Sequence, residues 1–107
     1  VVLDVAYKKD IDDWRESPAI HVLELLQESG ADVVYHDPYV PSFSEGGHSW
    51  TGVEMTDDLL KTSDLVIITT SHTHMDYQKV VDLAPLILDT REATRECKDP
   101  DHKVKHL

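Results

Sequence analysis

Basic side chains follow the first and the last apolar runs of an otherwise acidic chain. Lys8, Lys9 and Arg15 come after the first run, and Arg91 and Arg95 come after the last. Arginine binds a phosphate through paired hydrogen bonds and lysine acts as a point charge, so these five residues could bind an anion if the fold gathers them. The 107 residues include 21 Asp and Glu against 10 Lys and Arg. This balance argues against general nucleic-acid binding but permits a diphosphate at a local basic cluster.

Three histidines, His36, His72 and His74, also follow apolar runs. His72 and His74 are two residues apart, with Asp76 close by, which makes a metal site conceivable. Neither a cysteine nor a third histidine lies at a suitable spacing. We therefore favour a role for His72 beside a polar ligand over metal binding, and we expect no metal.

Aromatic and sulfur side chains give weaker signals. Tyr7 and Trp14 could stack on a base or fill the core, and the sequence leaves both open. Cys97 lies in a charged segment without a fixed base nearby, so a nucleophilic role is not expected. A single cysteine suits a reducing compartment. Because no apolar run reaches transmembrane length and no signal peptide is evident, we expect a cytoplasmic protein.

Apolar periodicity predicts alternating strands and helices. Ser17 and Pro18 suit the start of the first helix, Gly30 suits its end, and Thr56 suits the N-cap of the second. The predicted elements are strands at 1–6, 31–38, 64–70 and 85–90, helices at 17–30, 56–63 and 75–84, a long connection at 39–55 with a short strand near Val53, and a charged, frayed tail after Glu96.

This order predicts an α/β fold, a Rossmann-like three-layer sandwich with a mainly parallel sheet of about four to six strands. We expect one domain at 1–96 and a charged tail at 97–107. Ligands of such sheets bind beyond the carboxyl ends of the strands, where the basic and histidine-bearing loops would meet. The loop after the first strand, "YKKDID", has no glycine. Phosphate contact would therefore come from side chains and not from a glycine-rich turn.

Three segments, "VAYKKDIDDWRESPAI", "YHDPYVP" and "LILDTREATR", resemble the C-terminal, UDP-binding domain of the UDP-glucose/GDP-mannose dehydrogenase family over residues 1–95. The form of the first segment is most similar to the branch acting on UDP-N-acetylhexosamines. The resemblance implies a Rossmann-like unit that binds the nucleotide part of a UDP-sugar. NAD and the catalytic cysteine would belong to domains outside this chain.

The resemblance also implies roles for individual residues. Tyr7 and Lys8 match the aromatic–lysine pair that helps to hold the UDP-sugar, and Arg91 matches an arginine that reaches the substrate region. Arg15 could bind ligand or pair with the neighbouring "DIDD". Two residues depart from the family pattern: Asp4 stands where glycine is usual, and Glu92 stands where asparagine is common.

We therefore expect the UDP-sugar-binding domain of an NAD-dependent dehydrogenase that oxidises a UDP-hexose or UDP-N-acetylhexosamine to the uronic acid for polysaccharide biosynthesis. The parent enzyme would be a homo-oligomer, with no nucleic-acid or membrane partner, and the chain alone would be inactive. The alternative is a free-standing α/β nucleotide-binding or regulatory module without catalysis. A phosphoacceptor receiver domain fits less well, because the acids of "DIDD" lie far into the loop and "LILDT" ends without lysine.

Overall fold

The computed structural model describes residues 1–3, 18–45, 48–69 and 75–106. Their helices and strands are β1 (Val2–Leu3), α1 (Pro18–Glu28), β2 (Tyr35–His36), β3 (Ser42–Glu45), β4 (His48–Thr51), α2 (Asp57–Thr62), β5 (Val66–Ile68), α3 (Tyr77–Leu83), β6 (Ile87–Asp89) and β7 (Val104–His106). Within these residues, no helix is both long and apolar enough to cross a membrane.

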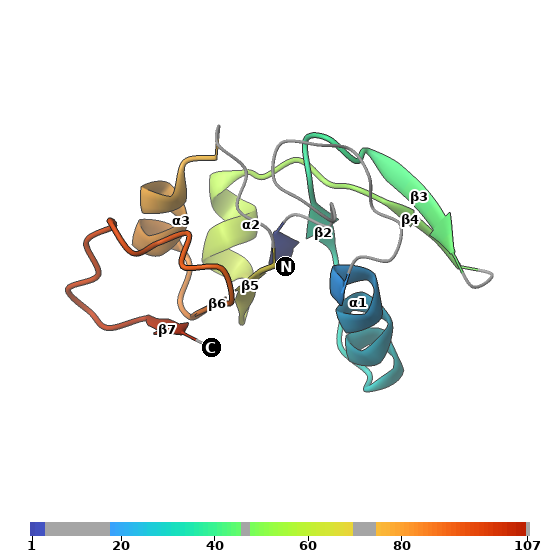
Figure 1. Cartoon of the computed structure of the whole chain (residues 1–107), viewed down its shortest axis with the longest axis horizontal. Helices are drawn as coiled ribbons and strands as arrows, with labels where there is room; N and C mark the ends of the chain where they lie inside the picture. Colours follow the sequence, from blue (N-terminus) through green and yellow to red (C-terminus); the bar gives the residue numbers. More distant parts are fainter. Residues whose placement is uncertain (4–17, 46–47, 70–74, 107) are drawn as a thin grey trace.

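Five strands form one parallel sheet in the order β2-β1-β5-β6-β7. Helix α1 lies on one side of the sheet, and α2 and α3 lie on the other (Figure 1). The predicted α/β, Rossmann-like sandwich with a parallel sheet is therefore confirmed.

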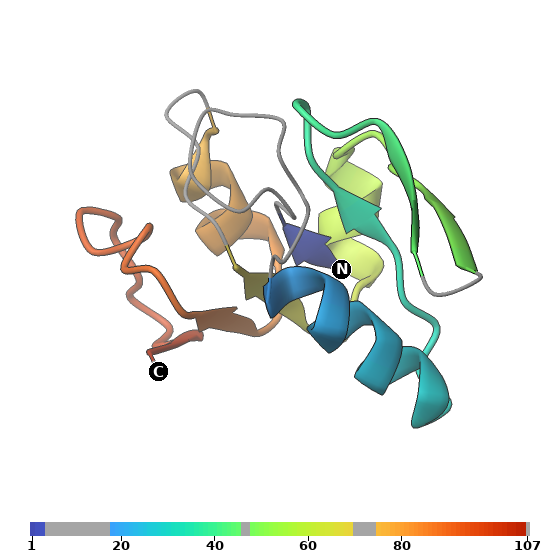
Figure 2. The same ribbon diagram turned by 45° about the vertical axis from the view of Figure 1, so that its right-hand side comes forward.

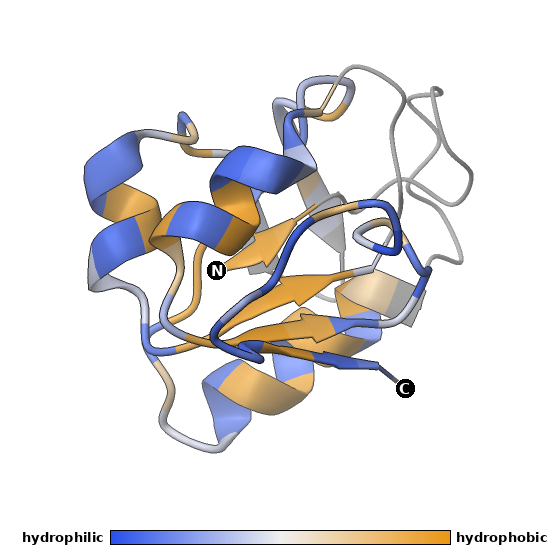
Figure 3. Cartoon of the chain, turned by 90° about the vertical axis from the view of Figure 1, so that its left-hand side faces the viewer, coloured by the Kyte–Doolittle hydropathy of each residue, from blue (hydrophilic) through white to orange (hydrophobic). Residues whose placement is uncertain are grey.

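The core is divided between the two faces of the sheet because successive strand residues point in opposite directions. Val2 and Ile67 pack with the apolar side of α1, whereas Leu3 and Ile68 pack with the buried residues of α2 and α3. Figure 3 shows these apolar strands between helices whose outer residues are hydrophilic.

The helix ends follow the predicted chemistry where they are described. Gly30 has a φ of 89° and donates its N–H to the carbonyl of Gln27 at 3.1 Å, while the Ala31 N–H donates to Leu26 at 3.1 Å. These two bonds form the Schellman motif that ends α1. At α2, the Thr56 hydroxyl accepts from the Leu59 N–H at 3.1 Å, as the predicted N-cap requires.

Residues 42–51, expected to be part of a long connection, instead contribute the strands of an antiparallel hairpin. Phe43 pairs with Trp50 across the two strands at a ring-centroid distance of 6.3 Å, and Phe43 also lies 5.3 Å from the ring of Tyr35. The hairpin lies beyond β2 at one end of the molecule (Figure 2). Phe43 and Trp50 pack into the hydrophobic core on the α1 side of the sheet and so attach the hairpin to the domain.

The prediction of a frayed tail is wrong for residues 104–106, which form β7 beside β6. The turn before β7 is stabilised by Asp99. The Asp99 carboxylate accepts from the Lys103 N–H and the Val104 N–H, both at 2.9 Å. These bonds fix the turn so that Val104 lies at the edge of the sheet and pairs with Ile87 of β6. The division into residues 1–96 and 97–107 stays a prediction.

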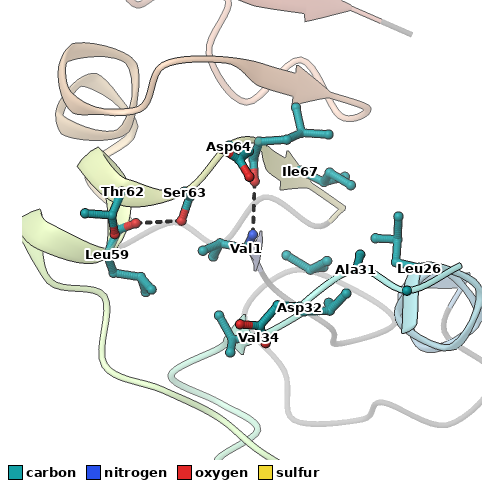
Figure 4. A pocket seen from close by; sticks show the side chains of 14 residues that line it. Val1, Leu26, Ala31, Asp32, Val34, Leu59, Thr62, Ser63, Asp64 and Ile67 are labelled. Carbon is teal, nitrogen blue, oxygen red and sulfur yellow. Dashed lines mark hydrogen bonds between the residues drawn. The ribbon is translucent and has the colours of Figure 1, made fainter. Parts of the chain in front are cut away.

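A cavity of about 590 Å³ lies at the amino-terminal edge of the sheet (Figure 4). It is lined by the chain leading into β2, including Asp32 and Val33, and by the chain leading into β5, including Asp64 and Leu65. Between them the Val1 amino group donates to the Leu65 carbonyl at 3.0 Å. The strands predicted at 31–38 and 64–70 are shorter in the structure, where β2 spans Tyr35–His36 and β5 spans Val66–Ile68.

Candidate functional site

The structure describes one of the five predicted ligand-binding residues. Tyr7, Lys8 and Arg15 fall in segment 4–17 and His72 falls in segment 70–74, so all four lie outside the described residues. Arg91 is described, and the site is therefore built from the carboxyl-terminal end of β6, where it lies. Asp4, Lys9 and His74 are likewise outside the described part of the chain.

Asp89, the last residue of β6, organises the loop that follows it. The carboxylate is 1% exposed. One oxygen, Oδ1, accepts from the backbone N–H of Arg91 at 3.0 Å and of Ala93 at 3.2 Å. The other oxygen, Oδ2, accepts from the Thr94 N–H at 2.9 Å and from the Thr94 hydroxyl at 2.6 Å. The carboxylate thus provides acceptors for three backbone N–H groups and one hydroxyl of the loop, which would otherwise lack a partner at the buried end of the strand.

These hydrogen bonds also determine the ionisation of Asp89. Burial alone raises the pKa of the carboxyl, because the charged form loses its hydration. The four hydrogen bonds, led by the Thr94 hydroxyl, outweigh burial and hold the pKa below its usual range. Asp89 is therefore a buried carboxylate at neutral pH.

The side chain of Arg91 extends from this loop toward the carboxyl end of β5. Its Nε–H donates to the Thr69 carbonyl at 3.1 Å, and the Thr69 hydroxyl donates to the Leu3 carbonyl at 3.0 Å. The residue before it, Thr90, donates its hydroxyl to the Ile68 carbonyl at 2.7 Å. Among the described residues, the two terminal nitrogens of Arg91 have no partner. The guanidinium is exposed, oriented through Nε, and free to bind an anion through its terminal N–H groups.

Glu92 has a φ of 55°, in the left-handed region that favours glycine and asparagine. This conformation turns the loop so that Arg91 and Ala93 can both donate to the same oxygen of Asp89. Asparagine, which the resemblance leads us to expect at this position, suits this backbone conformation better than glutamate does.

Arg95 and His36 show how widely the predicted site residues are spread. Arg95 is exposed, and its side chain has no partner among the described residues. His36 ends β2, which β1 and β5 separate from β6. Three strand spacings correspond to about 14 Å, so His36 shares the carboxyl edge with Arg91 without adjoining it. Its Nδ1 donates to the Val53 carbonyl at 2.7 Å, which ties the chain after the hairpin to β2.

The turn after β2 is a structural feature. Asp37 is 4% exposed, and its Oδ1 accepts from the Tyr39 N–H at 2.8 Å. The buried Tyr35 donates its hydroxyl to the Val40 carbonyl at 2.8 Å. Burial and the nearby Asp37 charge raise the pKa of Tyr35 to about 12. These contacts close the turn and leave no free group of Tyr35 to contact a ligand.

Sequence reasoning missed Asp89 and Thr94. The signal was an aspartate at the end of the apolar run "LILD", where a buried carboxylate needs donors, followed by a threonine five residues later. The metal hypothesis for His72 and His74 lies outside the described residues. Within those residues, His, Cys, Asp and Glu form no group of three that could hold a metal ion.

The fold defines a Rossmann-like α/β domain. Its sequence matches the UDP-glucose/GDP-mannose dehydrogenase family, UDP binding domain, over residues 1–96, so the chain belongs to that family and the predicted resemblance is confirmed. The UDP-N-acetyl-D-mannosamine dehydrogenase of Methanococcus maripaludis is 30% identical over 71 residues, which cover 66% of this chain and 15% of that protein. The UDP-glucose 6-dehydrogenase of Rickettsia bellii is 34% identical over 98 residues, which cover 84% of this chain and 23% of that protein.

Solved structures agree with these sequence relatives. The UDP-D-ManNAc dehydrogenase of Pyrococcus horikoshii has a TM-score of 0.72 and 25% identity, covering 99% of this chain and 24% of that one. The native UDP-N-acetyl-mannosamine dehydrogenase of Staphylococcus aureus has a TM-score of 0.68 and 28% identity, with the same coverage. The chain spans about a quarter or less of the length of these relatives.

Proposed function

We propose that this chain is the UDP-sugar-binding part of an NAD-dependent nucleotide-sugar 6-dehydrogenase. The observation that carries the proposal is the family match over residues 1–96. It is supported by the terminal nitrogens of Arg91 at the carboxyl edge of the sheet, which have no partner among the described residues. The parent enzyme would be a cytoplasmic homo-oligomer that converts a UDP-hexose or UDP-N-acetylhexosamine to its uronic acid for polysaccharide biosynthesis.

Arg91 would bind the diphosphate or another anionic group of the UDP-sugar, and Tyr7, Lys8, Arg15 and His72 would complete the site from the two neighbouring loops. Three backbone N–H groups of the loop after β6 cannot take over this role. The N–H groups of Arg91, Ala93 and Thr94 all donate inward to Asp89 and are not available to a phosphate. This favours side chains as the source of the contacts.

The inward-donating N–H groups of this loop also argue against an NAD site in this chain. A dinucleotide site of the Rossmann type presents backbone N–H groups of a glycine-rich turn to the pyrophosphate. The loop after β1 has no glycine in its sequence, and the N–H groups of Arg91, Ala93 and Thr94 in the loop after β6 donate to Asp89. These residues do not fit NAD, which the proposal assigns to a domain outside this chain. The chain's own contribution is to bind and orient the UDP-sugar.

The test is a titration of the 107-residue chain with UDP, followed by amide NMR shifts, with NAD as the control ligand. Shifts at Arg91 and its neighbours with UDP, and none with NAD, support the proposal. Arg91→Ala should weaken UDP binding by about 10-fold or more, since a hydrogen bond to a charged group contributes about 1.5–3 kcal/mol. Arg95→Ala is the matched control, because it removes the same charge from the same loop.

The contrary outcomes are distinct. UDP affinity that survives both Arg91→Ala and Lys8→Ala would remove the assigned residues from the site. Absence of any shift at millimolar UDP would show that the chain does not bind the nucleotide without further domains, and would overturn the proposal for this chain.

A further inference from the structure

Asp89 is 1% exposed, yet the four hydrogen bonds that its carboxylate accepts from described residues all come from the loop that carries Arg91. His106 of β7 is the further described neighbour, with its Nδ1 3.9 Å from Oδ2. We propose that Asp89 is a positioning residue for UDP-sugar binding, which holds the Arg91 guanidinium in its binding orientation through the loop of residues 91–94. The proposal rests on the proposed function of Arg91 as the anion-binding group.

A single carboxylate closes the loop of residues 91–94. Oδ1 takes the N–H groups of Arg91 and Ala93, and Oδ2 takes both donors of Thr94. Such charge-assisted bonds are stronger than neutral ones, and together they require the left-handed φ of 55° at Glu92. The carboxylate thereby selects one conformation from the several that an exposed loop could adopt.

The loop backbone in turn orients the Arg91 guanidinium. The Arg91 side chain is held at its base by the N–H bond to Asp89 and at Nε by the bond to the Thr69 carbonyl. Thr69 is itself bound to Leu3 in β1, because its N–H donates to the Leu3 carbonyl at 3.1 Å. Two fixed points leave the terminal nitrogens little freedom, which lowers the ordering cost when they bind an anion.

Thr94 is the partner of Asp89 that a substitution can alter with the least change in side-chain shape. Its hydroxyl makes the shortest of the four bonds, at 2.6 Å, and it is 4% exposed. Thr94→Val keeps the side-chain shape but removes the donor. Thr62→Val is a matched control, because the Thr62 hydroxyl also donates a short bond, of 2.7 Å to the Asp58 carbonyl in α2, away from the loop.

The coupling can be measured without any ligand. The chain has three arginines, and Arg91→Lys identifies the Arg91 Nε–H signal in the ¹⁵N spectrum. We expect slow exchange of this proton with water in the parent chain, exchange faster by about 5-fold or more in Thr94→Val and in Asp89→Asn, and no change in Thr62→Val. Unchanged exchange in a folded Thr94→Val would overturn the proposal, even if Asp89→Asn fails to fold.

A double-mutant cycle then connects the coupling to UDP. Thr94→Val and Asp89→Asn should weaken UDP binding by about 3- to 10-fold, and neither should weaken it further when Arg91→Ala is present. Equal losses in both backgrounds would mean that Asp89 affects binding without acting through Arg91. If Arg91→Ala has no effect on UDP affinity, the proposed function fails. If Arg91→Ala weakens UDP binding but Thr94→Val and Asp89→Asn do not, only the role of Asp89 is refuted.

Discussion

Glu92→Asn should stabilise the protein although the side chain is exposed. A non-glycine residue in the left-handed region costs about 1–2 kcal/mol, and asparagine is several-fold enriched there. At a φ of 55°, replacement of Glu92 by asparagine should recover about 1 kcal/mol. The Arg95 N–H donates to the Glu92 carbonyl at 3.3 Å, and this backbone bond is independent of the side chain. For a domain of this size the gain corresponds to a melting temperature higher by about 4 °C.

Differential scanning calorimetry of the parent chain, Glu92→Asn and Glu96→Asn measures this effect. Glu96 lies four residues further on, is exposed, and is not among the described non-glycine residues with positive φ. It therefore controls for the removal of one negative charge from an acidic chain. A rise for Glu92→Asn that does not exceed the rise for Glu96→Asn would refute the assignment of strain to the loop.

The remaining predictions concern a helix cap and two titratable groups. Thr56→Ala should lower the free energy of unfolding by about 1 kcal/mol in urea titrations, because the Leu59 N–H loses its acceptor, and Thr56→Ser should recover most of the loss. The lowered pKa of Asp89 stabilises the fold above the unfolded pKa of about 3.9, and this contribution is lost as pH falls through the folded pKa. Melting temperatures between pH 6 and pH 2 should therefore fall less steeply in Asp89→Asn, and an unaltered slope would contradict the network. For Tyr35, with its pKa raised to about 12, absorbance at alkaline pH should show one of the four tyrosines ionising late, and Tyr35→Phe should remove that step. This contribution to stability is complete below the unfolded pKa of about 10 and lost as pH rises through about 12.

The parts of the fold that sequence predicted are those with local causes. The β-branched run of β5 and the capping residues Thr56 and Gly30 act within a few residues, and the structure confirms them. The sequence prediction misses the hairpin because Gly46 and Gly47 favour a loop. The residues on either side, "SFS" and "SWT", nevertheless alternate polar and aromatic side chains with the period of a strand.

The candidate site divides in a similar way. Arg91 was predicted from its residue type and its place after an apolar run. Asp89 was not, because its role depends on donors that reach it only when residues 91–94 fold back over the end of β6. The strand β7 was missed for the related reason that its attachment relies on Asp99 and the turn that follows, within a segment whose charge indicates solvent exposure.

The cavity at the amino-terminal edge has a consequence for protein engineering. In parallel register, the second residue fused ahead of Val1 would lie level with both Asp32 and Asp64. A fusion peptide ending in a basic and then an apolar residue would extend β1 and place its positive charge between two carboxylates. One ending in an acidic residue at that position would meet like charge on both sides. The choice of affinity tag at this end therefore changes the stability of the domain itself, and two extended residues are enough to do so.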